Sequence, residues 1–292
     1  QALSSAQNPS FCEMQLLVSL FRLTRFWNLA IIALAQFFSA AFLFRQGAQA
    51  FTDIWLYILS ASTILIAAAG YIINDYYDIK IDLINKPERV VIGKTITRRY
   101  AILFHTMISF LGVALGLLIN WKVGAINFIC AFLLWLYSNN LKRQPLIGNV
   151  LVGLLTGLSV FVLVFLYEQF HVLVFVYALF AFFMTLIREV VKDMEDVKGD
   201  NTFGCKTLPI VWGIRRTKVF LYALIAIFSC VVVMMDFYQL SIPLIYFVPL
   251  LFAPMALLTV RLVLADTKMQ FYQLSQLCKL IMLLGISTMI FV

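Results

Sequence analysis

Nine long apolar runs divide this chain and leave few folds open to it. Each approaches the roughly 20 residues that a helix needs to cross a membrane. The chain is 63% hydrophobic and 12% charged, which is more apolar surface than 292 residues can bury in a water-soluble core. The runs do not alternate in polarity as barrel strands do. We therefore predict an all-α membrane protein, one domain over residues 1–292, with nine transmembrane helices at 26–44, 54–73, 100–119, 123–137, 146–167, 172–187, 219–235, 242–264 and 271–292.

Several runs carry features that modify a simple helix. The fourth and sixth are short, so we expect their helices to extend into the flanking polar residues. Pro243, Pro249 and Pro254 lie in or near the eighth run and are expected to kink that helix or delay its start. Gly153 and Gly157 have the small-x-x-x-small spacing that allows close helix packing.

Positive charge falls almost entirely on one side of the predicted topology. All 22 Lys and Arg residues except Arg45, Lys122 and Lys279 precede the first run or follow even-numbered runs. The positive-inside rule then places the N-terminus and these loops in the cytoplasm. The net charge of +8 follows from this topology and from attraction to anionic membrane lipid. Since no nucleic-acid recognition motif is present, we expect no nucleic-acid partner.

Most of the 14 acidic residues fall in two short windows, directly after the second and sixth runs. Each window holds three aspartates at steps of three and four residues: Asp75, Asp78 and Asp82, then Asp193, Asp196 and Asp200. These steps place three carboxylates on one helical face, where they repel each other unless a cation lies against them. Random clustering would not repeat one spacing twice, so we interpret both windows as binding sites rather than solvated loops.

The residue types in these windows favour a particular ligand. Carboxylates without His or Cys nearby suit a hard cation, and the lack of an EF-hand loop favours Mg²⁺ over Ca²⁺. Mg²⁺ is usually held by one or two carboxylates together with substrate phosphates. Basic residues that bind phosphate, among them Arg89, Arg188 and Lys192, stand between the acids. We therefore predict a diphosphate site at the membrane surface, with the apolar tail of the substrate in the bilayer.

The two windows resemble the UbiA superfamily of intramembrane prenyltransferases. The first motif of that family, N-D-x-x-D-x-x-x-D, is complete here from Asn74 to Asp82. Residues 188–200 are similar to the D-x-x-x-D-type cluster that the family carries on the loop after helix 6. The segment after the fourth run also resembles the family through Tyr137, Lys142 and Arg143.

The resemblance implies a helical bundle around a central cavity that opens sideways to lipid. It also implies transfer of a polyprenyl group from an allylic diphosphate to a lipophilic acceptor. The implied Mg²⁺ ligands, for two ions, are Asn74, Asp75, Asp78, Asp82, Asp193, Asp196 and Asp200, with the six aspartates catalytic. The implied substrate-binding residues are Asn74, Arg89, Tyr137, Lys142, Arg143, Arg188, Glu189 and Lys192.

The acceptor is less constrained than the donor. The run K-D-x-E-D-x-x-G-D, followed by T-L-P, most resembles the digeranylgeranylglyceryl phosphate synthase branch of the family, which favours a geranylgeranyl donor and prenylglyceryl phosphate. Cations of the loop after the sixth run favour a phosphorylated acceptor too: Lys192, Lys198, Lys206, Arg215 and Arg216. The alternatives are an aromatic acceptor, as in quinone or chlorophyll enzymes, and a terpene cyclase without acceptor. A divalent-cation transporter is remote, since its acids would lie near the bilayer midplane.

The repeated aspartate spacing predicts that both windows and a divalent cation are needed for turnover. Asp75→Ala and Asp196→Ala are each expected to lower the rate about a thousandfold or more, because several kcal/mol of leaving-group stabilisation are lost. Turnover of the purified variants and of the unmodified chain in EDTA tests this. Full activity in EDTA, or in either variant, would contradict it.

Overall fold

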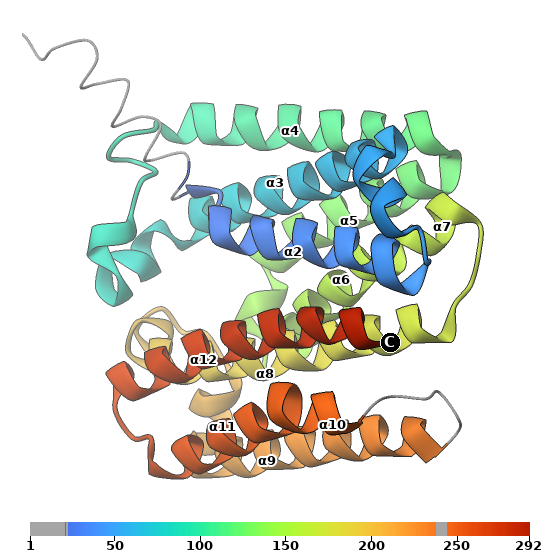
Figure 1. The fold of residues 1–292 in the computed structure, drawn as a ribbon. Coiled ribbons are helices and arrows are strands. Elements are labelled where there is room, and N and C mark those ends of the chain that lie inside the picture. Colours follow the sequence, from blue (N-terminus) through green and yellow to red (C-terminus); the bar gives the residue numbers. More distant parts are fainter. Residues whose placement is uncertain (1–20, 22, 238–243) are drawn as a thin grey trace, which may run out of the picture.

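The computed structural model describes residues 21, 23–237 and 244–292. Within these residues, nine helical segments are long and apolar enough to cross a membrane, as predicted. The α-helices are α2 (Phe26–Phe38), α3 (Ile54–Asn85), α4 (Arg98–Ile119), α5 (Trp121–Asn139), α6 (Ile147–Phe161), α7 (Leu163–Tyr167), α8 (Val172–Thr202), α9 (Leu208–Phe237), α10 (Leu244–Phe247), α11 (Ala253–Leu264) and α12 (Lys268–Ser287). They run side by side, and the α3–α4, α8–α9 and α11–α12 connections lie at the same end as the start of α2 (Figure 1).

Two helices extend well beyond their apolar runs. α3 continues to Asn85 and α8 to Thr202, so both aspartate triads lie within helices. The expectation that the second motif lies on a loop is therefore wrong. Neither extension contains proline, and the helices end only at Pro87 and near Gly204, which has a φ of 69°. The short fourth run extends as expected, because α5 spans Trp121–Asn139.

The helices that carry the triads are also the most enclosed. α3 packs against α4 and α5, and α8 packs against α6, α9 and α12. Gly153 and Gly157 allow α6 to approach α8 closely. A Cβ at Gly157 would lie 2.7 Å from the carbonyl oxygen of Ala178, and one at Gly153 would lie 3.1 Å from that of Phe182. The predicted packing role of these glycines is confirmed.

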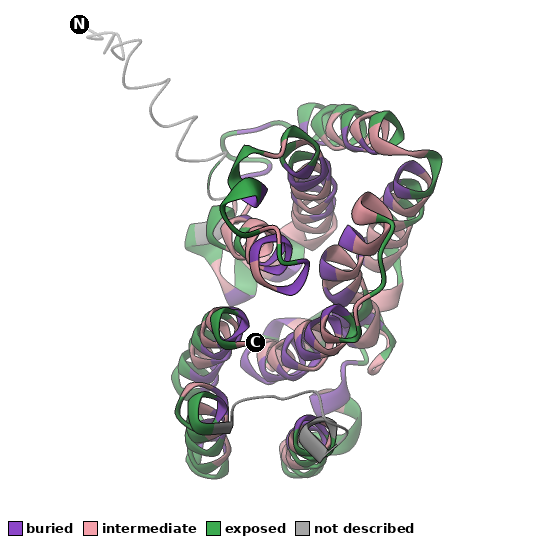
Figure 2. Cartoon of the chain, turned by 45° about the vertical axis from the view of Figure 1, so that its right-hand side comes forward, coloured by how far each residue is buried: buried purple, intermediate pink, exposed green. Residues whose placement is uncertain are grey.

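Buried and exposed faces are arranged as in a membrane bundle. In an oblique view the helices form a ring, with buried residues toward its centre and exposed residues outside (Figure 2). Large apolar side chains occupy the outer face, including Phe110, Leu118, Trp121 and Ile245. Apolar exposure of this kind matches a hydrocarbon surrounding rather than water.

Irregular backbone occurs in the two C-terminal spans. Pro249 lies in a π-helical segment, Val248–Phe252, and Pro254 lies at the start of α11, which confirms the expected kink. Pro243 is outside the described residues. Gly213, with φ 79° and ψ 157°, breaks α9, which begins at Leu208 rather than near residue 219 as predicted.

The close approach of α6 and α8 predicts a graded stability series. In Gly157→Ala, the new methyl group meets a backbone oxygen, and such overpacking costs about 1–3 kcal/mol. Helix propensity returns about 1 kcal/mol of this. Thermal unfolding in detergent is expected to show a lower midpoint for Gly157→Ala than for Gly153→Ala. Leu154→Ala, at an exposed position of the same helix, is the control. Equal midpoints for all three variants would contradict the close contact.

Candidate active site

Two adjoining cavities lie between the helices. The larger, of about 940 Å³, is formed by the acidic ends of α3 and α8 and is called the polar cavity here. The smaller, of about 220 Å³, is lined mostly by apolar side chains of α2, α3, α5, α6, α8 and α12 and is called the apolar cavity. Polar residues line both cavities where they meet, and this neck consists of Arg25, Asn28, Asn74, Tyr137, Arg188, Glu189, Lys192 and Lys279.

Residues predicted from the sequence converge on the polar cavity. Those that line it are Asn74, Asp75, Asp78, Asp82, Tyr137, Lys142, Arg188, Glu189, Lys192, Asp193, Asp196 and Asp200. Arg143 does not line it and is exposed. The turn Leu141–Arg143 directs Lys142 inward, with 10% of its side chain exposed. The side chain of Arg89 is outside the described part of the chain.

Cations and amides hold the first triad. Nη2 of Arg25, just before α2, lies 2.8 Å from Oδ1 of Asp75. Lys142, after α5, forms an ion pair with Oδ1 of Asp78. The side-chain amide of Asn74 donates to Oδ2 of the same carboxylate at 2.9 Å. The opposite charge favoured by the spacing of this triad is therefore supplied from two other segments.

The second triad is held in the same manner. Lys86 Nζ lies 2.8 Å from Oδ2 of Asp196 and 3.1 Å from Oε1 of Glu195, whose side chain is only 3% exposed. Asn149 of α6 donates to Oδ2 of Asp193 at 2.8 Å. Burial disfavours the charged form of Lys86, but its two carboxylate partners outweigh this and raise its pKa.

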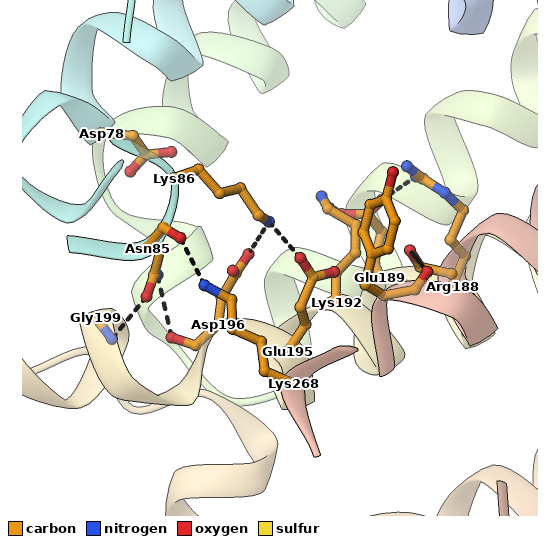
Figure 3. A network of polar contacts seen from close by, with 12 residues as sticks. Asp78, Asn85, Lys86, Arg188, Glu189, Lys192, Glu195, Asp196, Gly199 and Lys268 are labelled. Carbon is orange, nitrogen blue, oxygen red and sulfur yellow. Dashed lines mark hydrogen bonds and ion pairs between the residues drawn. The ribbon is translucent and has the colours of Figure 1, made fainter. Parts of the chain in front are cut away.

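Asn85 joins the ends of the two acidic helices. Its Nδ2 donates to the carbonyl oxygen of Asp196 at 3.1 Å, and its Oδ1 accepts from the backbone N–H of Gly199 at 2.9 Å (Figure 3). Lys268 of α12 donates to the carbonyl oxygen of Asn85 at 2.6 Å. Only glycine fits at 199, because a Cβ there would lie 2.4 Å from Asn85 Nδ2. These bonds fix the separation of the two triads.

Carboxylate oxygens remain for a metal ion. Among the described residues, the side chains of Asp82 and Asp200 have no hydrogen bond or ion pair, and the buried Oδ1 of Asp196 has no partner. No three acid, His or Cys side chains in that part of the chain converge on one point. Free carboxylate oxygens around an open cavity suit Mg²⁺ that is shared with substrate phosphates. The residues present therefore fit the predicted cofactor.

Basic residues are distributed differently from the sequence-based expectation. Glu189 accepts from both Arg188, at 2.6 Å, and Lys192, at 2.9 Å, within the neck. The other cations expected to serve a phosphorylated acceptor are exposed and line neither cavity: Lys198, Lys206, Arg215 and Arg216. Of the proposed set, Lys192 alone lines the described cavities.

Some cavity residues were not identified from the sequence. Arg25 and Lys279 had been assigned only to topology and to the ninth run, yet both lie in the neck. The signal for Lys279 was present, since a lysine within a membrane span is by default a functional candidate. Asn85 and Asn149 gave no such signal, because their partners lie on other helices.

Comparison with known proteins decides the family. The profile of the UbiA prenyltransferase family matches residues 21–274. The chain belongs to this family. It is therefore a prenyltransferase and an integral membrane protein, and the family resemblance predicted from the two motifs is confirmed. Membership also favours this enzyme class over the cation transporter.

Curated relatives fall in the branch that the second motif favoured. The digeranylgeranylglyceryl phosphate synthase of Methanosphaera stadtmanae is 34% identical over 197 residues, which are 67% of this chain and 72% of that protein. The synthase of the same name from Sulfurisphaera tokodaii is 36% identical over 204 residues, which are 69% and 73%.

Solved structures share the fold. One from work on digeranylgeranylglyceryl phosphate synthase in membranes has a TM-score of 0.70 at 26% identity and covers 94% of this chain and 97% of that one. A UbiA homologue from Archaeoglobus fulgidus, bound to GPP and Mg²⁺, has a TM-score of 0.66 at 18% identity and covers 93% and 99%. The predicted all-helical membrane fold is confirmed.

The buried ion pair between Lys86 and Glu195 predicts a stability defect with a specific rescue. In Lys86→Met, a buried carboxylate is left unpaired, which costs about 3–5 kcal/mol. Glu195→Gln in the same chain removes that charge and is expected to restore part of the loss. Thermal unfolding in detergent measures both, with Lys80→Met, an exposed lysine of α3, as the control. A Lys86→Met variant as stable as the control would contradict the pairing.

Proposed function

We propose that this enzyme catalyses Mg²⁺-dependent transfer of a geranylgeranyl-type group from its diphosphate to a hydroxyl group of prenylglyceryl phosphate. The observation that carries this proposal is the pair of cavities, one polar with two aspartate triads and one apolar, which adjoin at the neck. A donor with an anionic head and a hydrocarbon chain fits this pair. The names of the curated relatives support the phosphorylated acceptor.

In this proposal the polar cavity binds the diphosphate. Two Mg²⁺ ions are assigned to Asn74, Asp75, Asp78, Asp82, Asp193, Asp196 and Asp200. Mg²⁺ supplies positive charge that stabilises the departing diphosphate. The free oxygens of Asp82, Asp196 and Asp200 support the assignment. Asn74 orients Asp78 through its amide, as second-shell groups do at metal sites.

Basic residues complete the donor site. Lys142, which lies beside Asp78 and is 10% exposed, is assigned a direct contact with the diphosphate. Lys192 at the neck is close enough in the cavity lining to assist it. Arg143 is not assigned such a contact, since it is exposed and lines neither cavity.

The reaction that these groups support is a substitution at C1 of the prenyl chain. The bond between C1 and the diphosphate oxygen breaks, and its electron pair leaves with the diphosphate. The acceptor hydroxyl oxygen forms the new C–O bond, and its proton passes to the released diphosphate. Tyr137 at the neck presents an aromatic face that favours positive charge developing on the allylic carbon.

The enzyme's orientation follows from its charges. We place the N-terminus and the loops bearing the active site in the cytoplasm, because nearly all Lys and Arg lie at that end. Residues 1–292 then form a single prenyltransferase domain. The donor would enter with its chain in the bilayer and its head at the cytoplasmic surface.

Product analysis tests the proposed function. Purified enzyme with geranylgeranyl diphosphate and Mg²⁺ is offered prenylglyceryl phosphate, 4-hydroxybenzoate or no acceptor, and products are identified by mass spectrometry. We expect the prenyl diether of glycerol phosphate, and no product with Asp78→Ala. Prenylation of hydroxybenzoate alone would contradict the acceptor assignment. Hydrocarbon formed without acceptor would indicate a cyclase.

A further inference from the structure

The neck holds more positive than negative charge. Its basic residues are Arg25, Arg188, Lys192 and Lys279, and its one acid is Glu189. Asp75 offsets Arg25. Arg188 and Lys192 share the single carboxylate of Glu189. Together with Asp75, the neck therefore carries four cations and two carboxylates, in a partly buried setting where unbalanced charge is costly.

Hydrogen-bond donors in the neck point to an anionic ligand as well. Nε of Arg188 and Oγ1 of Thr185 are buried and have no hydrogen-bond partner among the described residues. The two residues are one turn apart on α8, and both line the apolar cavity. A buried donor left unpaired costs about 1–3 kcal/mol, and more when it is charged. A ligand with several acceptor oxygens would remove this cost.

The diphosphate of the donor does not account for these donors. Its proposed site is the polar cavity, where Lys142 and the free carboxylate oxygens lie. With its chain in the apolar cavity, the donor would present C1 at the neck. An acceptor hydroxyl must reach C1, and in a glycerol phosphate lipid the phosphate is only a few bonds from that hydroxyl. The acceptor phosphate would therefore lie at the neck too.

We propose that Arg188 and Lys279 bind the phosphate group of the acceptor, a glycerol phosphate monoester with one prenyl chain, and thereby select it over uncharged acceptors. Arg188 approaches from α8 and Lys279 from α12, on opposite sides of the neck. Thr185 supplies a neutral donor one turn farther into the apolar cavity. This inference rests on the proposed function, and the experiment separates the two.

The first measurement is binding, without prenyl diphosphate or turnover. Full-length enzyme in nanodiscs is titrated with geranylgeranylglyceryl phosphate and with geranylgeranylglycerol, which lacks the phosphate. We expect the unmodified enzyme to prefer the phosphate by about tenfold or more, since a charge-assisted bond is involved. Lys279→Met is expected to lose most of this preference and Lys279→Arg to keep it. Arg188→Lys keeps the charge but loses Nε, and is expected to lose part.

The second measurement is steady-state kinetics with Mg²⁺. Lys279→Met is expected to raise KM for prenylglyceryl phosphate about tenfold or more and KM for geranylgeranyl diphosphate less than about threefold. A merely structural role would raise both or lower kcat alone. Lys122→Met, an exposed lysine that lines neither cavity, is the matched control.

The outcomes distinguish the two proposals. If the unmodified enzyme prenylates no glycerol phosphate lipid, the proposed function fails, and binding still decides the inference about the neck. Equal affinity of the unmodified enzyme for the two glycerol lipids would overturn that inference. So would a Lys279→Met variant that keeps the full preference for phosphate, whatever product the enzyme makes.

Discussion

The structure depends on charge balance at the ends of two membrane helices. α3 and α8 each carry three aspartates on one face, and such triads repel each other in a medium poorer in water than the bulk solvent. Arg25, Lys86 and Lys142 come from three other segments and place a cation on one aspartate each. The connections between spans are thereby held against the acidic ends. What makes the site chemically useful also holds its surroundings in place.

This balance explains why part of the site was predictable. The triads were visible because their spacing lies within single helices, and a period of three and four residues is local information. The choice of Lys142 over Arg143 depends on how one short turn is oriented, and the sequence places both residues side by side. The apolar runs identified the spans, but they stopped short of the helix ends, because polar residues that face a cavity continue a helix as readily as apolar ones.

Contacts between distant helices were beyond reach. Arg25 meets Asp75 from fifty positions away, and Lys268 meets Asn85 from 183 positions away. Neither pairing has a local signature in the sequence. The break at Gly213 was missed for another reason: a glycine in an apolar stretch indicates either close packing or a break, and only its φ of 79° distinguishes them.

The fit between Asn85 and Gly199 has a consequence for sequence variation. The asparagine amide occupies the volume that any side chain at position 199 would need, and it hydrogen-bonds the backbone there. Two positions 114 residues apart therefore behave as one unit of inheritance. A chain that acquired a larger residue at 199 would survive only with a smaller one at 85 and another way to join its helix ends. In related chains, the two positions would then change together or not at all.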